Sequence, residues 1–351
     1  MSIKGKIIFL IIIVGIILLI LVGNIINSHK KEVLEKSSEI ELIKSNEFRK
    51  LLDLIVTSEM IDASGASTRN QDKYLEVSSQ RIASKMIARG IADNNNDLIE
   101  KGIKAIEYGF EHQNTDGSFQ YDSSLIQMGA TQADLLEAGS FFLDSVGHSY
   151  LLIEQTNFAI KYKSRLDLLK PKILLSLKWL ESNKEELFNK AEDAPNRLIF
   201  DALSFKLNGI ILKDKDYQNI GDEFIKENLK MQRNEGVFLE HGGHDSSYQA
   251  VNLMKLQIYR MYSDNQDLIK QIDSALIKGM VWEKTRIKEN GEIDVTGNTR
   301  TGNCQEQVYE KCKEVNYQEV ALSLMYYAGL YEDKEAEKLA EKVINYALTQ
   351  S

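Results

Sequence analysis

Apolar residues recur every three or four positions through almost the whole chain from residue 38 to residue 349, as in Ile103, Ile106 and Phe110. This period is that of an α-helix with one apolar face. Only two prolines occur in 351 residues, which fits because proline interrupts helix interiors. The sequence therefore predicts an all-α fold of about a dozen helices. Their expected ranges are 38–60, 72–92, 96–112, 130–145, 147–163, 169–191, 196–212, 216–232, 246–262, 265–283, 315–330 and 333–349.

Three segments between these helices resemble one another: QNTDGSFQYD (113–122), QRNEGVFLEH (232–241) and IKENGEIDVT (287–296). Each has an acid or Asn before a glycine and a large apolar residue two positions later. Glycine permits the positive φ of a tight turn, and the apolar residue anchors the loop. Around Asn290-Gly291 a short hairpin over 286–295 is also expected. The repetition predicts helical hairpins in a ring, an (α/α) toroid. An α-solenoid is the alternative, but no fixed repeat of about 33 to 47 residues is visible.

The N-terminal segment contains an uncharged run, IIFLIIIVGIILLILVG, over residues 7–23. A helix of about 20 residues spans the roughly 30 Å of a bilayer core. The run is longer than the apolar region of a secretory signal, and NIINSHKK after it offers no small-residue cleavage site. We therefore predict an uncleaved transmembrane anchor. Lys4 and Lys6 favour a cytoplasmic N-terminus, although Lys30 and Lys31 follow the run.

The expected organisation is then a single-pass protein of the cell membrane with its body outside the cytoplasm. Residues 1–29 form the anchor, residues 30–50 a charged helical stalk, and residues 51–351 the toroid domain. The net charge of -9 argues against nucleic acid as a partner. Cys304 and Cys312 form one local disulfide if they lie outside the cell, or stay two thiols inside it. Too few metal ligands accompany them for a zinc site, so we expect no metal, and the lyase chemistry considered below requires no cofactor.

Polar residues suited to catalysis lie where the predicted helices begin. In NEGVFLEHGGHDSSYQ (234–249), Asp245 or Ser246 is a natural N-cap and Tyr248 lies in the first helical turn. Its side chain should point back toward the loop, so we expect His241 and Tyr248 to face one cleft. Upstream, Pro195 opens a helix and places Asn196 in its first turn. The remaining candidates are Arg197, beside that asparagine, and Asn298 and Arg300 in the downstream segment DVTGNTRTGNC.

The order of these residues resembles the polysaccharide lyases of the hyaluronate, chondroitin and xanthan lyase type. PNRLIFDALSFKLNGIILKD is similar to the family's GANR helix, which carries its catalytic Asn, here Asn196. NEGVFLEHGGHDSSY is similar to its DGSF-x-x-H…Y segment, which carries the catalytic His and Tyr, here His241 and Tyr248. Arg300 in GNTRTG falls where the family has its catalytic Arg. The resemblance covers roughly residues 90–350.

Two departures from the family concern its Tyr and its aromatic patch. The family's Tyr lies about two residues further from its His. TQADLLEAGS (131–140) stands where the family has an aromatic patch, with Gln132, Ala133 and Leu135 in place of its Asn and two aromatics. Tyr121, Phe141 or Tyr150 could substitute as a sugar platform. The family's C-terminal β-sandwich domains have no counterpart among the segments that resemble it.

The resemblance implies β-elimination beside a uronate in an acidic polysaccharide. Asn196 would hydrogen-bond the uronate carboxylate, with Arg197 or Arg300 adding positive charge. Tyr248 or His241 would take the proton at C5, and Tyr248 would return one to the leaving oxygen. For this role the pKa of Tyr248 should be lowered by Arg300. The residues expected to bind substrate are Arg197, Gln132, Asp116, His244, Asp245 and Asn298.

Two other functions fit the same sequence. One is an inverting glycoside hydrolase, since helical toroids also carry such enzymes and need two carboxyl groups on opposite sides of the bond to be cleaved. Four acids in the predicted loops are candidates: Asp116, Glu240, Asp245 and Asp294. The other is a protein that binds or assembles an exopolysaccharide without cutting it. The ultraviolet absorbance of an unsaturated product separates a lyase from both.

Overall fold

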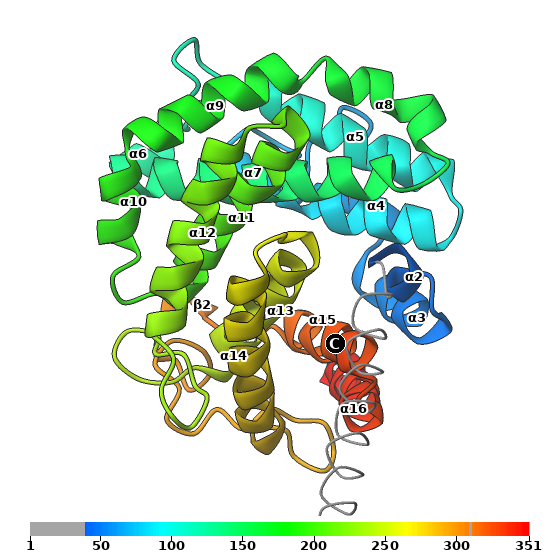
Figure 1. Cartoon of the computed structure of the whole chain (residues 1–351), viewed down its shortest axis with the longest axis vertical. Coiled ribbons are helices and arrows are strands. Elements are labelled where there is room, and N and C mark those ends of the chain that lie inside the picture. Colours follow the sequence, from blue (N-terminus) through cyan, green and yellow to red (C-terminus); the bar gives the residue numbers. More distant parts are fainter. Residues whose placement is uncertain (1–38, 309–310, 351) are drawn as a thin grey trace, which may run out of the picture. The chain divides into compact units, whose positions relative to one another are not determined.

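The computed structural model describes residues 39–308 and 311–350 (Figure 1). Within these ranges the chain is almost wholly helical, which confirms the all-α prediction. The predicted anchor over residues 1–29 and the first part of the predicted stalk lie outside the described residues. The longer elements are α3 (Asn46–Ile55), α4 (Ala83–Ala92), α5 (Asn96–Glu111), α7 (Gln132–Glu154), α8 (Ala159–Asp167), α9 (Lys170–Ser182), α11 (Pro195–Leu212), α12 (Lys215–Lys230), α13 (Ser246–Tyr262), α14 (Gln266–Thr285), α15 (Tyr317–Tyr331) and α16 (Lys334–Gln350).

Shorter elements complete the described chain. They are α2 (Glu39–Ile43), the 3₁₀ helices η1 (Ser58–Met60), η2 (Thr68–Asn70) and η3 (Val77–Ile82), α6 (Ser123–Gln127), α10 (Lys184–Lys190), and an antiparallel pair of strands, β1 (Gln307–Val308) and β2 (Lys311–Cys312). None of the helices in the described ranges has the length and apolar character needed to cross a membrane.

The helices fall into two groups by their burial. In α7 every residue from Ala138 to Ile153 is buried, so this helix is surrounded by protein on all sides. In α16 the buried residues are Ala336, Ala340, Val343 and Ile344, a single stripe at helical spacing. α11, α13 and α15 resemble α7, whereas α5, α12 and α14 resemble α16.

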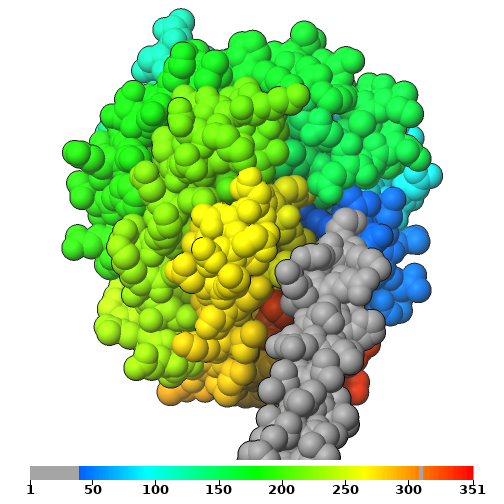
Figure 2. Space-filling model, in the orientation of Figure 1, coloured from blue at the N-terminus to red at the C-terminus, as the bar shows by residue number. Residues whose placement is uncertain are grey.

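The contacts follow this division. α4 packs on α7, α7 on α11, α11 on α13, and α13 on α15. The amphipathic helices α5, α12, α14 and α16 cover α4, α11, α13 and α15, while α8 and α9 pack on α7. α3 contacts both α15 and α4, so the series of contacts returns to its start. On the face seen in Figure 2, the side chains of α12, α13 and α14 form a continuous surface.

Four loops share one turn conformation, including the three that the sequence identified. Isolated bridges pair residues 61 with 67, 113 with 119, 232 with 238 and 287 with 293. Each turn has a glycine with φ between 91° and 99°, and a Cβ on it would lie 2.2–2.4 Å from a carbonyl oxygen of another helix. The glycine and carbonyl pairs are Gly65 with Lys104, Gly117 with Leu175, Gly236 with Lys278, and Gly291 with Lys342. The hairpin expected over 286–295 is therefore only this turn with one bridge.

The prediction of two helices over 130–145 and 147–163 is wrong, because α7 runs unbroken through Gly147. A Cβ at Gly147 would lie 2.7 Å from the Cβ of Leu207 on α11. Gly147 therefore permits close packing of α7 on α11 and does not end the helix. Because α7 is buried on all sides, its sequence also lacks the single apolar stripe from which helix ends are predicted.

Residues 39–55, which include part of the predicted stalk, form α2 and α3, and these helices pack on α4, α15 and α16. The carboxylate of Glu39 is buried and accepts three hydrogen bonds. The donors are His148 Nε2 at 2.7 Å, the Tyr326 hydroxyl at 2.7 Å and the Tyr262 hydroxyl at 2.8 Å. They lie on α7, α15 and α13, so α2 is held by three of the buried helices.

Candidate functional site

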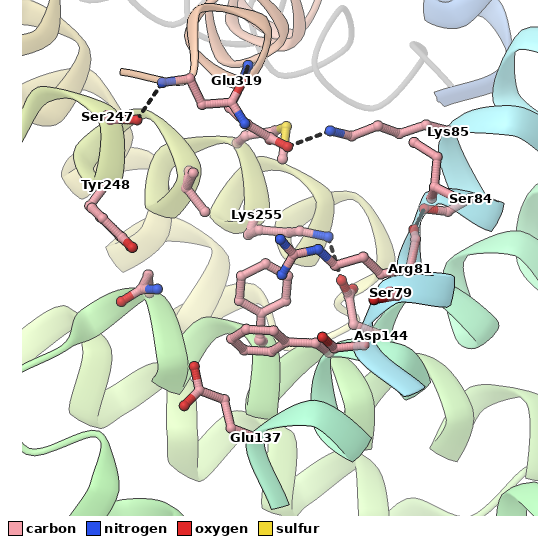
Figure 3. A pocket seen from close by; sticks show the side chains of 18 of the residues that line it. Ser79, Arg81, Ser84, Lys85, Glu137, Asp144, Ser247, Tyr248, Lys255 and Glu319 are labelled. Carbon is pink, nitrogen blue, oxygen red and sulfur yellow. Dashed lines mark hydrogen bonds and ion pairs between the residues drawn. The ribbon is translucent and has the colours of Figure 1, made fainter. Parts of the chain in front are cut away.

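A cavity of about 510 Å³ lies among the buried helices. Its lining comes from η2 and η3, the start of α4, α7, α11, α13, the loop before α15 and the first turn of α15. Asn196, Tyr248 and Arg300, three of the four predicted catalytic residues, line it together. Figure 3 shows the hydroxyl of Tyr248 directed into the cavity from one side. This volume is typical of ligand sites, so the cavity is the candidate site.

Asn196 lies directly after Pro195 in the first turn of α11. Its side chain is buried, and its amide oxygen has no hydrogen-bond partner among the described residues. Buried polar atoms are normally paired, so an unpaired amide on a cavity wall is free to bind a ligand. The oxygen and nitrogen of this amide are interchangeable by rotation, so the group offers an acceptor or a donor.

The position of Tyr248 is set by Asp245, the N-cap of α13. Asp245 Oδ1 accepts from the backbone N–H of Ser247 and Tyr248 and from the Thr301 hydroxyl at 2.8 Å. Its Oδ2 accepts from the backbone N–H of Arg300 at 2.9 Å and of Thr301 at 2.7 Å. Both oxygens are therefore occupied by protein donors. Asp245, which we expected to bind substrate, instead joins the loop of Arg300 to the helix of Tyr248.

Asn298 has a similar structural role. Its Oδ1 accepts from the Ser246 backbone N–H at 3.1 Å and from the Ser246 hydroxyl at 3.0 Å, and its Nδ2 donates to Thr301 Oγ1. The side chain is buried and absent from the cavity lining. Asp245 and Asn298, both predicted to bind substrate, thus connect the start of α13 to the loop that carries Arg300.

Arg300 stacks on the face of Tyr248, with its guanidinium carbon 4.1 Å from the ring centroid. Its Nη1 donates to Glu240 Oε1 at 2.6 Å, and its Nε donates to Glu306 Oε2 at 2.6 Å. Lys313 lies 5.0 Å from the same ring centroid and also binds Glu306. The loop thus surrounds Tyr248 with paired charges.

The expectation that Arg300 lowers the pKa of Tyr248 below its ordinary value is wrong. Burial raises this pKa well above the ordinary value, and the positive charge of Arg300 offsets only part of the effect. Arg300 lies over the ring face and shares its charge with Glu240 and Glu306. Tyr248 is therefore a neutral phenol at neutral pH, and no described residue hydrogen-bonds its hydroxyl.

His241 is not part of the cavity lining. It lies in the loop with a φ of 51°, and its Nδ1 is 2.7 Å from Asp193 Oδ2. Its Nε2 is 3.8 Å from Oε1 of Glu240, the carboxylate that pairs with Arg300. His241 thus lies behind Arg300, and the expectation that it faces one cleft with Tyr248 is not met. Burial raises the pKa of Glu240 to about 7, although Arg300 and His241 lower it.

The other expected substrate ligands lie outside the lining as well. Arg197 Nε forms an ion pair with Glu137 at 3.2 Å, and Glu137 does line the cavity. His244 Nε2 is 3.1 Å from the Thr296 carbonyl oxygen. Gln132 and Asp116 are exposed, and Asp116 Oδ1 accepts from Ser118 in its turn. With Asp245 and Asn298, all six predicted substrate ligands therefore lie outside the lining, held by local structure or on the surface.

The opposite side of the cavity carries charged residues that the sequence did not identify. Lys255 pairs with Asp144, and Lys85 pairs with Glu319 (Figure 3). Arg81 lies 5.5 Å from the ring centroid of Phe141 and has no carboxylate partner in the part of the chain that the structure describes. Phe141 and Phe200 are in contact with ring centroids 4.2 Å apart. Asp144 is the one carboxylate in the buried run 138–153 of α7, and an acid in such a run was the available signal.

Cys304 and Cys312 are joined in a disulfide that spans the β1–β2 hairpin. Arg300 and Lys313 lie directly beside this hairpin, and the Gly302 backbone N–H donates to the Lys313 carbonyl oxygen at 2.8 Å. The disulfide thus closes the loop that supplies one wall of the cavity. Across the described ranges, no three His, Cys, Asp or Glu side chains come together as a metal site would require.

Neither the known protein-family models nor the curated proteins include a match to this chain.

Proposed function

We propose that the body is an (α/α) toroid, a ring of buried helices surrounded by a second, amphipathic layer. Three observations support this arrangement. The buried helices contact one another in sequence and return to the start through α3. Each of four of them has its own amphipathic partner. The glycine turn occurs four times, each time against a carbonyl group of another helix.

We further propose that the protein acts on an acidic polysaccharide and cleaves it by β-elimination beside a uronate. The observation that carries this proposal is the cavity that Asn196, Tyr248 and Arg300 share. Its lining has more basic than acidic side chains, although the whole chain has a net charge of -9. The basic ones are Arg69, Arg81, Lys85, Lys255, Arg300 and Lys313, and the acidic ones are Glu137, Asp144, Glu314 and Glu319. Such a local excess attracts an anionic ligand.

In this mechanism the amide of Asn196 donates to the uronate carboxylate and stabilises the charge that develops when the C5 proton leaves. Tyr248 in its phenolate form takes that proton. The C4–O bond then breaks as the C4–C5 double bond forms, and Tyr248 returns the proton to the leaving oxygen. The phenolate is regenerated, so no cofactor is consumed. Arg300 and Lys313, at 4.1 Å and 5.0 Å from the ring centroid, stabilise the phenolate.

The test is the ultraviolet absorbance of an unsaturated uronate when the purified protein is incubated with uronate-containing polymers. We expect Tyr248→Phe to lower the rate by about 100-fold or more and Asn196→Ala by about 100-fold. Ser182→Ala, at an exposed helix end, should leave the rate unchanged. If new reducing ends form without the unsaturated product, the protein is a hydrolase and not a lyase. If the polymer binds but neither product forms, the protein is a non-catalytic polysaccharide-binding protein.

We also propose that the body lies outside the cytoplasm on a single-pass anchor. The uncharged run over residues 7–23 supports the anchor. The Cys304–Cys312 disulfide supports the location, because disulfides persist in oxidising compartments. Protease added to intact cells should therefore digest the body, whereas a cytoplasmic body would be protected until the cells are lysed.

A further inference from the structure

Lys255 and Asp144 form an ion pair among the buried helices. Lys255 belongs to α13 and Asp144 to α7, and α11 packs on both of these helices. The side chain of Lys255 is only 10% exposed and that of Asp144 only 2%, so water has little access to the pair. The two residues are 111 positions apart in the sequence, so their contact connects distant parts of the fold.

A second buried lysine pair shows how a carboxylate is kept ionised. Lys206 donates to Asp222 at 3.0 Å, and these side chains are as buried as those of the first pair. Asp222 also accepts from the Tyr259 hydroxyl and, at 3.0 Å, from the Asn265 amide. Hydrogen bonds to the charged form of an acid favour that form. Three donors therefore stabilise the negative charge of Asp222.

Asp144 lacks such support. Within the described ranges Lys255 is its only side-chain donor, and its Oδ1 is buried without a partner. Burying an ion pair costs free energy unless further hydrogen bonds satisfy the remaining lone pairs. Transfer of one proton from the ammonium to the carboxylate removes both charges. A neutral amine, which is a nucleophile, then contacts a neutral carboxylic acid, which is an electrophile.

Aromatic rings lie beside the amine. Lys255 Nζ is 4.8 Å from the ring centroid of Phe200, and the rings of Phe200 and Phe141 are in contact with centroids 4.2 Å apart. Lysine amines act as nucleophiles when they are desolvated in apolar pockets. The surroundings of this pair are thus suited to a reaction between its two side chains.

Glu319 provides a proton acceptor near the pair. Its Oε1 pairs with Lys85, and its Oε2 has no partner in the part of the chain that the structure describes. Burial alone would raise the pKa of Glu319, but nearby basic side chains, Lys255 among them, hold this pKa below its ordinary value. Glu319 is therefore ionised at neutral pH. Figure 3 shows Lys255 between Asp144 and Glu319.

The ion pair contains every atom of an amide bond. The Lys255 nitrogen attacks Asp144 Cγ, and Glu319 takes a proton from the nitrogen and passes it to the departing Oδ2. The N–Cγ bond forms as the Cγ–Oδ2 bond breaks. Two of the three ammonium protons leave with that oxygen as one water molecule, so atoms and charge balance without an oxidant or a cofactor. Fixed contact between the reacting groups offsets the unfavourable equilibrium of amide formation in water.

We propose that Lys255 and Asp144 are joined by an intramolecular amide bond, with Glu319 as the proton carrier. This inference does not depend on the proposed function. The bond connects α7 to α13 and closes a long loop, which stabilises the fold by restricting the unfolded chain. It removes one basic and one acidic side chain from the cavity lining, so the excess of basic side chains there is unchanged.

Mass spectrometry of the full chain tests for the bond directly. We expect the denatured, reduced protein to be lighter than its sequence by one water molecule. Digestion with trypsin should release a branched species in which the peptide with Asp144 is attached to the peptide with Lys255, and cleavage after Lys255 should be absent. The full sequence mass with two separate peptides would overturn the proposal, and so would a loss of water at any other pair of residues.

Three variants identify the roles of the residues. Lys255→Met removes the amine and should restore the full mass of its sequence. Lys206→Met, at the buried pair that we expect to remain ionic, is the matched control and should keep the loss of water. Glu319→Gln keeps the size of the side chain but removes the proton acceptor. It should slow bond formation by about 100-fold, measured as the linked fraction at fixed times after synthesis.

The outcomes are independent of the reaction that the protein catalyses. A loss of water that is present in the wild type and absent from Lys255→Met supports the bond, even if no polymer yields an unsaturated product. If Lys255→Met does not fold, as circular dichroism would reveal, the mass of the wild type and its branched peptide decide alone. Full linkage in Glu319→Gln at the earliest time would overturn the role of Glu319.

Discussion

Replacing Glu39 with alanine should destabilise the whole body, because Glu39 connects α2 to three buried helices. Its carboxylate is the shared acceptor for His148, Tyr262 and Tyr326 on three different helices. All three donors lose their acceptor in Glu39→Ala, and Gln155 does not replace it for Tyr262 because its amide donates to the Tyr262 oxygen. Each buried polar group left unpaired costs about 1–3 kcal/mol.

The three donors lie close together, so one water molecule or one local rearrangement can satisfy more than one of them. We therefore expect Glu39→Ala to lower the free energy of unfolding by about 3–5 kcal/mol, as for other broken buried pairs. Glu39→Gln is the matched control. Its oxygen still accepts from His148 and Tyr326, and its amide can donate to the Tyr262 hydroxyl, so the cost should be about 1 kcal/mol.

Urea denaturation followed by circular dichroism measures the difference in the free energy of unfolding. Its dependence on pH gives a second reading. Burial alone would raise the pKa of Glu39, but His148 and the tyrosine hydrogen bonds hold it below the ordinary 4.5. This stabilisation is therefore present above about pH 4.5 and is lost as the pH falls through the lower folded-state pKa. The explanation would be refuted if Glu39→Ala and Glu39→Gln lowered the free energy of unfolding equally, or if Glu39→Ala lowered it by less than about 1 kcal/mol.

Three further predictions concern the site and the turns. Because the pKa of Tyr248 is raised, the phenolate fraction and the lyase rate should climb about tenfold per unit from pH 7 to pH 9, and a flat profile would exclude Tyr248 as the base. The folded-state pKa of Glu240 is about 7, whereas its ordinary pKa is 4.5. Between these pH values Glu240 ionises in the unfolded chain before it does so in the folded protein, so the free energy of unfolding falls as the pH rises. Glu240→Gln should remove that part of the slope in urea titrations. Gly236→Ala should cost about 2–4 kcal/mol because its Cβ would meet the Lys278 carbonyl oxygen, whereas Gly242→Ala, also at positive φ but with open space, should cost only about 1–2 kcal/mol.

The sequence predicted the helices well where each had one apolar face, as α5, α12 and α16 do. Their periodicity is a local property, so it is readable without the fold. α7 was divided wrongly because a helix buried on all sides has no single stripe, and because Gly147 resembles a break until its contact with Leu207 is known. The glycine turns were recognised from their local pattern, except for the turn at Gly65, where Ser67 stands in place of the large apolar residue.

The candidate site was predicted only in part for a related reason. Asn196, Tyr248 and Arg300 lie at helix starts and in one loop, and the resemblance of their order to that of a lyase family suggested that they meet. The opposite wall comes from η3, the start of α4, the interiors of α7 and α13 and the first turn of α15, whose convergence depends on packing. The pKa of Tyr248 was predicted with the wrong sign because its burial, and the two carboxylates that share Arg300, are tertiary properties.

The short spacing between His241 and Tyr248 explains why only one of them reaches the cavity. Asp245 caps α13 and is tied to the Arg300 loop by three hydrogen bonds, so the start of the helix is fixed. Only three residues then separate His241 from the cap, and its backbone N–H is held by the Asp193 carbonyl oxygen at 2.7 Å. The loop therefore ends beside Glu240, behind Arg300. From that position His241 lowers the pKa of Glu240, which pairs with Arg300, but it does not line the cavity. The spacing, two residues shorter than in the family that the sequence resembles, thus leaves Tyr248 as the only one of the two expected bases that lines the cavity.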